Sequence, residues 1–393
     1  MGLFRPERRA STFLGMLPDL PMRGYNSSAG VLVNDTQAMR NATVWACVWK
    51  YAKLISSQPY HAFREVEGIP NKLPEPAVLR EPAPGVRRAH WLSQQVVSLM
   101  LRGNCFGLIL GTQANGYPSG VQILHPDRVQ AKYDWRTDIT EYRVEGQLIP
   151  NDRIWHTAIN VPPGSPFGLS TVGAARQSIG MGIASMEYGS EWFNSGGHPT
   201  AVLKTDQEVN ADQAGAIKSR WRDAITDDRG VAVLGQGFDY EAVQVSPQDA
   251  EFLNAYKVSA QDICRFFDMP PEMVGLDSGA SMTYSNVESR ALDLLRYSID
   301  PVLVEVEAGL SELVPRGQYV KANRAALLQM TTTERYVAHA SALRNGWRSV
   351  NEIRALEELA PIGEDGDHYV WPPHATSYEG DQTGVTPPPR DEE

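Results

Sequence analysis

Cysteine is scarce in this chain of 393 residues, which contains only Cys47, Cys105 and Cys264. The three lie too far apart for a zinc knuckle or a CxxC redox pair, and each has apolar neighbours. We therefore expect three reduced cysteines in the core. No stretch reaches the ~18 apolar residues that a membrane-spanning helix needs, and the first residues lack the apolar centre of a secretory signal. The sequence thus predicts a soluble protein that is intracellular when made and has no membrane partner.

The usual sequence motifs of enzymes are absent too. The chain has no GxxxxGK[ST] phosphate loop, no GxGxxG after a strand, no HExxH and no GxSxG elbow. His125, His156 and His198 stand alone in different segments, so none has the neighbours of a metal or catalytic site. We predict no catalytic residue, no cofactor and no metal. A hydrolase whose carboxylates come together from distant segments stays open as an alternative.

Positive charge is in deficit, with 36 Lys and Arg against 47 Asp and Glu and a formal net charge of −11. Such a surface repels polyanions on average, which argues against a sequence-specific DNA or RNA binder. The hydrophobic content of 42% is sufficient for a sizeable core. For a chain of this length, we expect two or three structural units.

The periodicity of apolar residues predicts an α+β unit near the N-terminus, after a mobile arm over residues 1–30. A helix is expected from Asn41 until Pro59 ends the pattern, and another over Ala89–Leu101, closed by Gly103. Short strands are expected at Tyr60–Val66, Cys105–Leu110, Val121–Leu124, Val129–Tyr133, Glu141–Val144 and Arg153–Thr157.

Two long helices are expected next, Ser170–Asn194 and Pro247–Phe267, with a small insert of strands and a helix between them. The first is rich in small residues, which lower helix propensity. Either it packs tightly in its own core or it presses against other copies of the chain in a ring. The small residues are Gly173, Ala174, Ala175, Gly180, Gly182, Ala184, Ser185 and Gly189.

The most informative segment follows the second long helix, which stops at Pro270 and Pro271 and opens into a loop without Lys or Arg. This composition is unsuited to holding phosphate tightly. A long helix over Asn286–Val314 comes next, with Pro301 as the expected site of a kink. Two further helices are expected at Thr332–Arg344 and Val350–Leu359, before a tail with the composition of disorder.

From Asn41 to Asp367 the order of local motifs resembles the portal proteins of long-tailed double-stranded DNA bacteriophages. The pieces that carry this resemblance are Asn41–Val48, Ile55–Pro59, Arg102–Phe106, Asp152–His156, Gly168–Ser170, Trp192–Pro199, Asp262–Pro271, Leu276–Asn286, Val350–Arg354 and Gly363–Asp367.

The resemblance implies a portal fold within the α+β class, with a wing, a helical-hairpin stem, a small α/β clip, a kinked long helix and a short helical crown. Its parts would be a flexible arm (1–30), wing (31–168), first stem helix (169–199), clip (200–246), second stem helix (247–271), tunnel loop (272–285), long kinked helix and return to the wing (286–330), crown (331–371) and disordered tail (372–393).

The resemblance also implies a structural role, not an enzymatic one. Portal subunits form a ring, typically of twelve, that conducts double-stranded DNA at one capsid vertex, so we expect a virion protein that resides in the host cytoplasm during assembly. The implied partners are other copies of the chain, the terminase large subunit, a head–tail connector or adaptor protein, the major capsid protein and scaffold, and DNA bound transiently without sequence specificity. Another ring-forming head–tail component is the alternative. The tunnel-loop residues expected near the channel axis are Met273, Val274, Asp277, Ser278, Ser281, Met282 and Tyr284.

Overall fold

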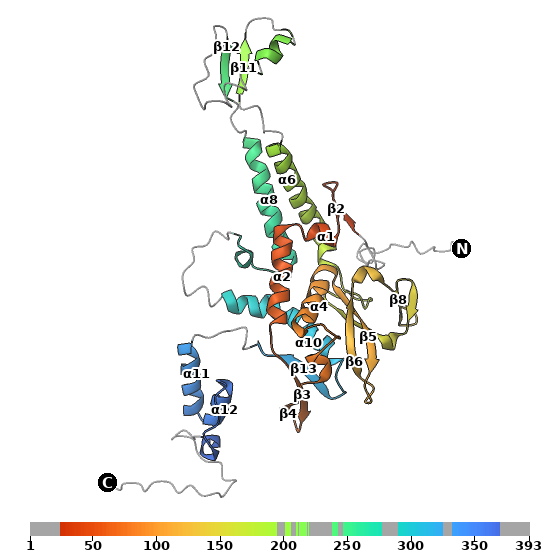
Figure 1. Cartoon of the computed structure of the whole chain (residues 1–393), viewed down its shortest axis with the longest axis vertical. Coiled ribbons are helices and arrows are strands. Elements are labelled where there is room, and N and C mark those ends of the chain that lie inside the picture. The colour runs from red at the N-terminus through yellow and green to blue at the C-terminus, as the bar shows by residue number, and fades with distance from the viewer. Residues whose placement is uncertain are drawn as a thin grey trace, which may run out of the picture. The chain divides into compact units, whose positions relative to one another are not determined.

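A computed structural model describes residues 24–194, 201–205, 210, 212–217, 219, 238–242, 247–276, 290–324 and 332–369 (Figure 1). The chain divides into two compact units, Met1–Leu327 and Leu328–Glu393. The first unit combines helices with small antiparallel sheets, as the α+β prediction expects. In the described part of the chain no helix is both long and apolar enough to cross a membrane.

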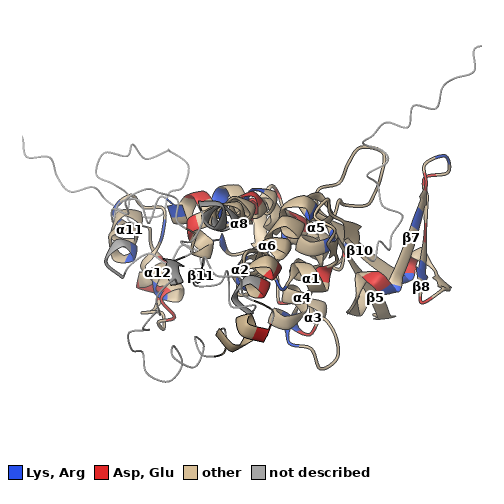
Figure 2. Ribbon diagram, turned by 90° about the horizontal axis from the view of Figure 1, so that it is seen from above, with Lys and Arg blue, Asp and Glu red and all other residues tan. Residues whose placement is uncertain are grey.

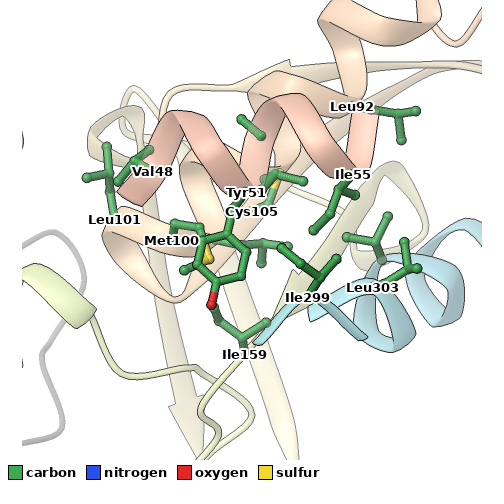
Figure 3. Packing of buried hydrophobic residues seen from close by; sticks show 14 of the residues in the cluster. Val48, Tyr51, Ile55, Leu92, Met100, Leu101, Cys105, Ile159, Ile299 and Leu303 are labelled. Carbon is green, nitrogen blue, oxygen red and sulfur yellow. The ribbon is translucent and has the colours of Figure 1, made fainter. Parts of the chain in front are cut away.

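Two helices, α2 (Ala42–Ser56) and α4 (Arg88–Arg102), form the centre of the first unit. The Asn41 side chain accepts hydrogen bonds from the first turn of α2, and Gly103 ends α4 in a left-handed conformation with φ of 72°. Residues at three- and four-residue spacing on α2, including Val48, Tyr51 and Ile55, face the core (Figure 3). Both predicted helices are confirmed: α4 agrees with Ala89–Leu101 to within one residue at each end, and α2 starts one residue after Asn41 but ends at Ser56, short of Pro59.

Within the described residues of the first unit, three sheets consist of three antiparallel strands each. Strand β5 (Asn104–Thr112) lies between β6 (Pro118–Leu124) and β10 (Ile154–Ala158). A second sheet consists of β7 (Val129–Asp134), β8 (Ile139–Val144) and β9 (Gln147–Ile149). In the third sheet, β3 (Tyr60–Val66) lies between β4 (Ile69–Lys72) and β13 (Gln318–Ala322).

Residues 24–30 correct one prediction, because they were assigned to a mobile arm. Here β1 (Tyr25–Asn26) pairs with β2 (Leu32–Val33). The Ser28 N–H donates to Gln177 Oε1 of α6 at 2.8 Å, which holds this short hairpin on the helix. Periodicity and composition do not predict this contact, because it joins segments far apart in the chain. Residues 1–23 lie outside the described residues.

The two long helices lie side by side, α6 (Arg176–Asn194) against α8 (Pro247–Phe266) (Figure 1). The predicted helix from Ser170 is not continuous: Ser170 caps a short α5 (Thr171–Ala174), and the chain leaves helical geometry at Ala175 before α6 begins. Between the long helices in sequence, β11 (Ala201–Thr205) pairs with β12 (Phe238–Ala242), and residues 212–217 are helical. The part of the predicted insert over residues 220–237 lies outside the described residues.

The long helix is irregular just before Pro301. Residues 290–293 are α-helical, Leu294–Ile299 form a π-helix (η5), and α10 (Asp300–Ser311) continues in α-helical form. Proline lacks an N–H and its ring crowds the preceding turn, so the wider π turn accommodates it. The structure thus shows a change of helix type before Pro301, and the kink expected at Pro301 stays a prediction. Helix α10 also ends earlier than the predicted Val314.

The second unit is small and helical. It contains α11 (Thr332–Arg344), α12 (Val350–Leu356) and a short 3-10 turn, η7 (Glu364–Asp367). Ser349 and Glu352 form a capping box at the start of α12. The helix ends before the predicted Leu359 because Glu358 adopts a left-handed conformation with φ of 56°.

Candidate functional site: the helical pair and the foot of the uncharged loop

The chain enters the α5–α6 segment through a close crossing of two backbones, at Gly103 and Gly168. A Cβ atom on Gly168 would collide with the carbonyl oxygens of Ile159 and Gly103, and a Cβ atom on Gly103 would collide with that of Leu169. Gly103 also has a positive φ, which disfavours other residues. Both chain segments therefore need glycine where they cross.

Asn104 fixes this crossing by hydrogen bonds on both sides of its amide. Its Nδ2 donates to the carbonyl oxygens of Arg102 (3.0 Å) and Gly168 (2.8 Å), and its Oδ1 accepts from the Gly168 N–H at 2.9 Å. Ser170 Oγ adds a bond to the Leu101 carbonyl at 2.8 Å. Three motifs that the resemblance identified separately, at 102–106, 152–156 and 168–170, thus meet at one junction.

His156 completes the junction as a neutral side chain. Burial lowers its pKa from 6.5 to about 4. Its Nε2 lies 3.0 Å from Asn104 Oδ1, an acceptor, so the proton resides on Nε2, and Nδ1 can accept from Tyr142 Oη at 3.4 Å. The ring stacks on Phe106 with centroids 4.6 Å apart. His156 is therefore a structural side chain.

The pKa of His156 predicts acid lability. The folded-state pKa lies below the unfolded value, so the neutral ring contributes stability above pH 6.5 that is lost as the pH falls toward 4. We expect the free energy of unfolding to fall by roughly 2–3 kcal/mol across this window. Urea unfolding at a series of pH values measures the loss. A His156→Gln variant should lack this component, and an unchanged pH profile in that variant would contradict the assignment.

The small residues of the first long helix pack within the chain. A Cβ on Gly182 would lie 2.9 Å from both Asn41 Nδ2 and Ser259 Oγ. Gly173 and Gly180 face Tyr25 and Ser27 of the N-terminal hairpin in the same manner. Ser259 of α8 donates a hydrogen bond to the Ser178 carbonyl at 2.6 Å. At these three glycines, close packing within one subunit is confirmed.

The outer surface of the helical pair is unusually apolar for a solvent-facing surface. On α6, Met181, Met186 and Tyr188 are 51%, 57% and 51% exposed, and on α8 Val258 and Phe266 are 55% and 46% exposed. Exposed apolar residues that form a contiguous patch are typical of a surface for association with another protein. The alternative that the small residues of this helix press against other copies of the chain stays a prediction.

The first part of the predicted tunnel loop is anchored to the core. Residues Pro271–Val274 form a 3-10 turn, η4, which Gly275 ends with φ of 82°. Met273 and Val274 are half-buried and pack against the main hydrophobic cluster. The approach of these two residues to a channel axis stays a prediction. Asp277, Ser278, Ser281, Met282 and Tyr284 lie outside the described residues.

Helix α2 holds the end of α8 in place beside this turn. Tyr51 Oη donates to the Phe267 carbonyl at 2.9 Å. One turn earlier on both helices, the thiols of Cys47 and Cys264 are hydrogen-bonded, and this bond together with burial raises the pKa of Cys47. All three cysteines are buried and free of disulfides, as predicted. The loop therefore starts from a fixed point.

An ion pair that the sequence did not predict joins Glu272 and Arg290, which we call the two feet of the loop because they lie on either side of it. Arg290 Nε, at the start of the following helix, lies 3.8 Å from Glu272 Oε1 of η4, and their side chains are 22% and 25% exposed. Sequence reasoning considered only the absence of cations within the loop. The nearest signal was the position of Glu272 at the first residue of the predicted loop and of Arg290 shortly after its last, which does not specify a pairing.

Charges elsewhere on the described surface are mixed. Figure 2 shows Lys and Arg interspersed with Asp and Glu over the helices and hairpins in that view. Within the described ranges, no group of three or more His, Cys, Asp and Glu could hold a metal ion.

A groove of about 510 Å³ between the start of α2 and the helical pair is lined by Arg40, Met186, Glu187, Glu191 and Tyr256, among others.

Comparisons with known proteins agree with this arrangement. Residues 42–358 match the family model described as phage portal protein. The probable portal protein of Streptomyces phage phiC31 is 26% identical over 90% of this chain and 82% of the relative. The portal protein of Enterobacteria phage HK97 is 22% identical, over 87% and 84%. A chain in the neck of a native gene transfer agent particle, computed with C12 symmetry, is similar in fold with a TM-score of 0.59 and 18% identity, over 83% of this chain and 92% of that one.

Proposed function

Because this chain belongs to the phage portal protein family, we propose that twelve copies form the ring at the portal vertex of a capsid and conduct double-stranded DNA during packaging and ejection. The observation that supports this proposal most is the order of three features: the paired helices α6 and α8, the anchored turn η4, and a loop without Lys or Arg. In this proposal residues 169–199 and 247–271 are the stem, 272–285 the tunnel loop, and 31–168 the wing.

The outer surface of the helical pair supports assembly into a ring. Its exposed methionine, tyrosine, valine and phenylalanine side chains need a cover, and identical neighbours in a ring supply one. The C12 symmetry of the similar gene transfer agent neck supports the number twelve.

The charge of the chain supports passage of DNA without capture. Twelve copies at −11 each would give a ring of about −130, which disfavours tight contact with phosphates. In the proposal the terminase large subunit and a connector protein dock at residues 200–246, and the terminase supplies ATP hydrolysis. The major capsid protein and scaffold contact the wing. The finished ring resides in the virion.

Native mass measurement tests the ring. We expect a mass of twelve subunits, and a persistent monomer under every condition would count against the proposal. A Met181→Glu/Met186→Glu variant should lose the ring because it buries two carboxylates between neighbours. Leu148→Glu is the matched control, since Leu148 is similarly exposed (55%) but lies on β9. An electron microscopy map that places residues 272–285 on the outer surface of the ring would overturn the tunnel-loop assignment.

A further inference from the structure

We propose that Glu272 masks the charge of Arg290, so that the foot of the loop presents no free cation to DNA passing through the ring. This inference rests on the proposed channel. It assigns Glu272 a role in keeping DNA mobile, beyond fastening two ends of a loop.

The geometry places the two residues at the two feet of the loop. Glu272 belongs to η4, whose residues Met273 and Val274 pack against the core, so the main chain that carries the carboxylate has a fixed position. Arg290 Nε lies 3.8 Å from it, and both side chains keep about a quarter of their surface exposed. The pair is thus reachable by a large anion such as a DNA phosphate.

Arg290 is the first cationic residue after Arg265, because the intervening stretch contains neither Lys nor Arg. Arg265 is itself paired, with Asp262 one turn earlier on α8. Both arginines that flank the loop therefore have a carboxylate partner. The loop contains no Lys or Arg, and the two arginines that flank it are each paired with a carboxylate.

A free arginine here would act as a phosphate clamp. Arginine binds phosphate through a planar fork of donors, and each phosphate neutralised releases counterions from DNA. In a ring of twelve the same residue recurs twelve times at one level of the channel. Even a weak contact of this kind would be multiplied and would slow a sliding duplex.

The test uses assembled rings of the full chain and a linear duplex of about 100 base pairs, which is stiff at that length. Retention of labelled DNA is measured from about 50 to 200 mM salt. We expect Glu272→Gln to retain linear DNA at least about tenfold more tightly at the lowest salt, with a salt dependence steeper by about one or more. The double variant Glu272→Gln/Arg290→Gln should return to the behaviour of the unaltered ring.

Two controls separate masking from general effects. Glu145→Gln removes the same charge from the surface pair of Glu145 with Arg128, within the residues assigned to the wing, and should leave retention of linear DNA near that of the unaltered ring. A closed circular duplex cannot thread a ring, so Glu272→Gln should retain it no better than the unaltered ring does. If the Glu272→Gln ring does not assemble, Glu272→Asp takes its place. This substitution shortens the side chain, and it should also increase the retention of linear DNA.

Three results would overturn the inference: equal retention by Glu272→Gln and the unaltered ring, failure of the double variant to revert, or equal gain with circular DNA. If the proposed function itself is wrong, the experiment gives a different result. In that case the unaltered chain forms no ring, or its rings do not admit linear DNA at all.

Discussion

Gly168→Ala is expected to destabilise the subunit by about 4 kcal/mol, enough to leave much of it unfolded or insoluble. The added Cβ would collide with two carbonyl oxygens of the main chain, those of Ile159 and Gly103, which cannot rotate away as a side chain does. The junction would have to separate, and the bonds between Asn104 and Gly168 would break. Urea unfolding and the soluble fraction measure the effect.

Gly164→Ala is the matched control in the same connecting segment. Gly164 has φ of 80°, but a Cβ there would meet no atom within 4 Å. Its replacement should cost only the strain of a left-handed alanine, about 1 kcal/mol. If both variants lose similar stability, backbone conformation and not the collision is responsible, and the junction is less tightly packed than described.

The second large effect is expected from Arg324→Ala, which should cost about 3 kcal/mol. Arg324 binds both carboxylate oxygens of Glu307, at 2.7 and 3.2 Å, and also pairs with Asp300. The Glu307 side chain is only 8% exposed, so the substitution leaves a buried carboxylate without its main partner. Glu307 also accepts the Ala322 N–H, at 2.8 Å, which joins α10 to β13.

Arg128→Ala is the comparison for this prediction. Arg128 pairs with Glu145 at the surface, where the two side chains are 53% and 63% exposed, and its loss should cost at most about 0.5 kcal/mol. The double variant Arg324→Ala/Glu307→Gln should recover part of the stability because it removes the unpaired charge. Equal losses in Arg324→Ala and Arg128→Ala, or no recovery in the double variant, would contradict the importance of burial here.

The features that the sequence predicted well are those set by neighbouring residues. Helix α2 follows from the spacing of Val44, Cys47, Val48 and Tyr51 and from the cap at Asn41. Helix α8 and the first strand of the third sheet, β3, were likewise placed within one residue. Caps and apolar periodicity act within one element, so one sequence is sufficient to locate them.

The features that were missed depend on distant partners. Strand β13 obtains its ladder from β3, and β4 is fully exposed and contains Pro70, which is tolerated at an edge. The ion pair between Glu272 and Arg290 joins residues on either side of a loop. The interruption at Ala175 and the π-helix before Pro301 are local, but apolar periodicity does not distinguish them from a continuous helix.

The pairing of β13 with β3 has a consequence for synthesis of the chain. Strand β3 has one neighbour, β4, as soon as both leave the ribosome, but its other edge stays open until residues 318–322 emerge. By then the helical pair, the insert and the loop have all been translated. The sheet can therefore close only after residues 318–322 have been translated. A chain that ends before β13 would expose the unpaired edge of β3, which favours aggregation.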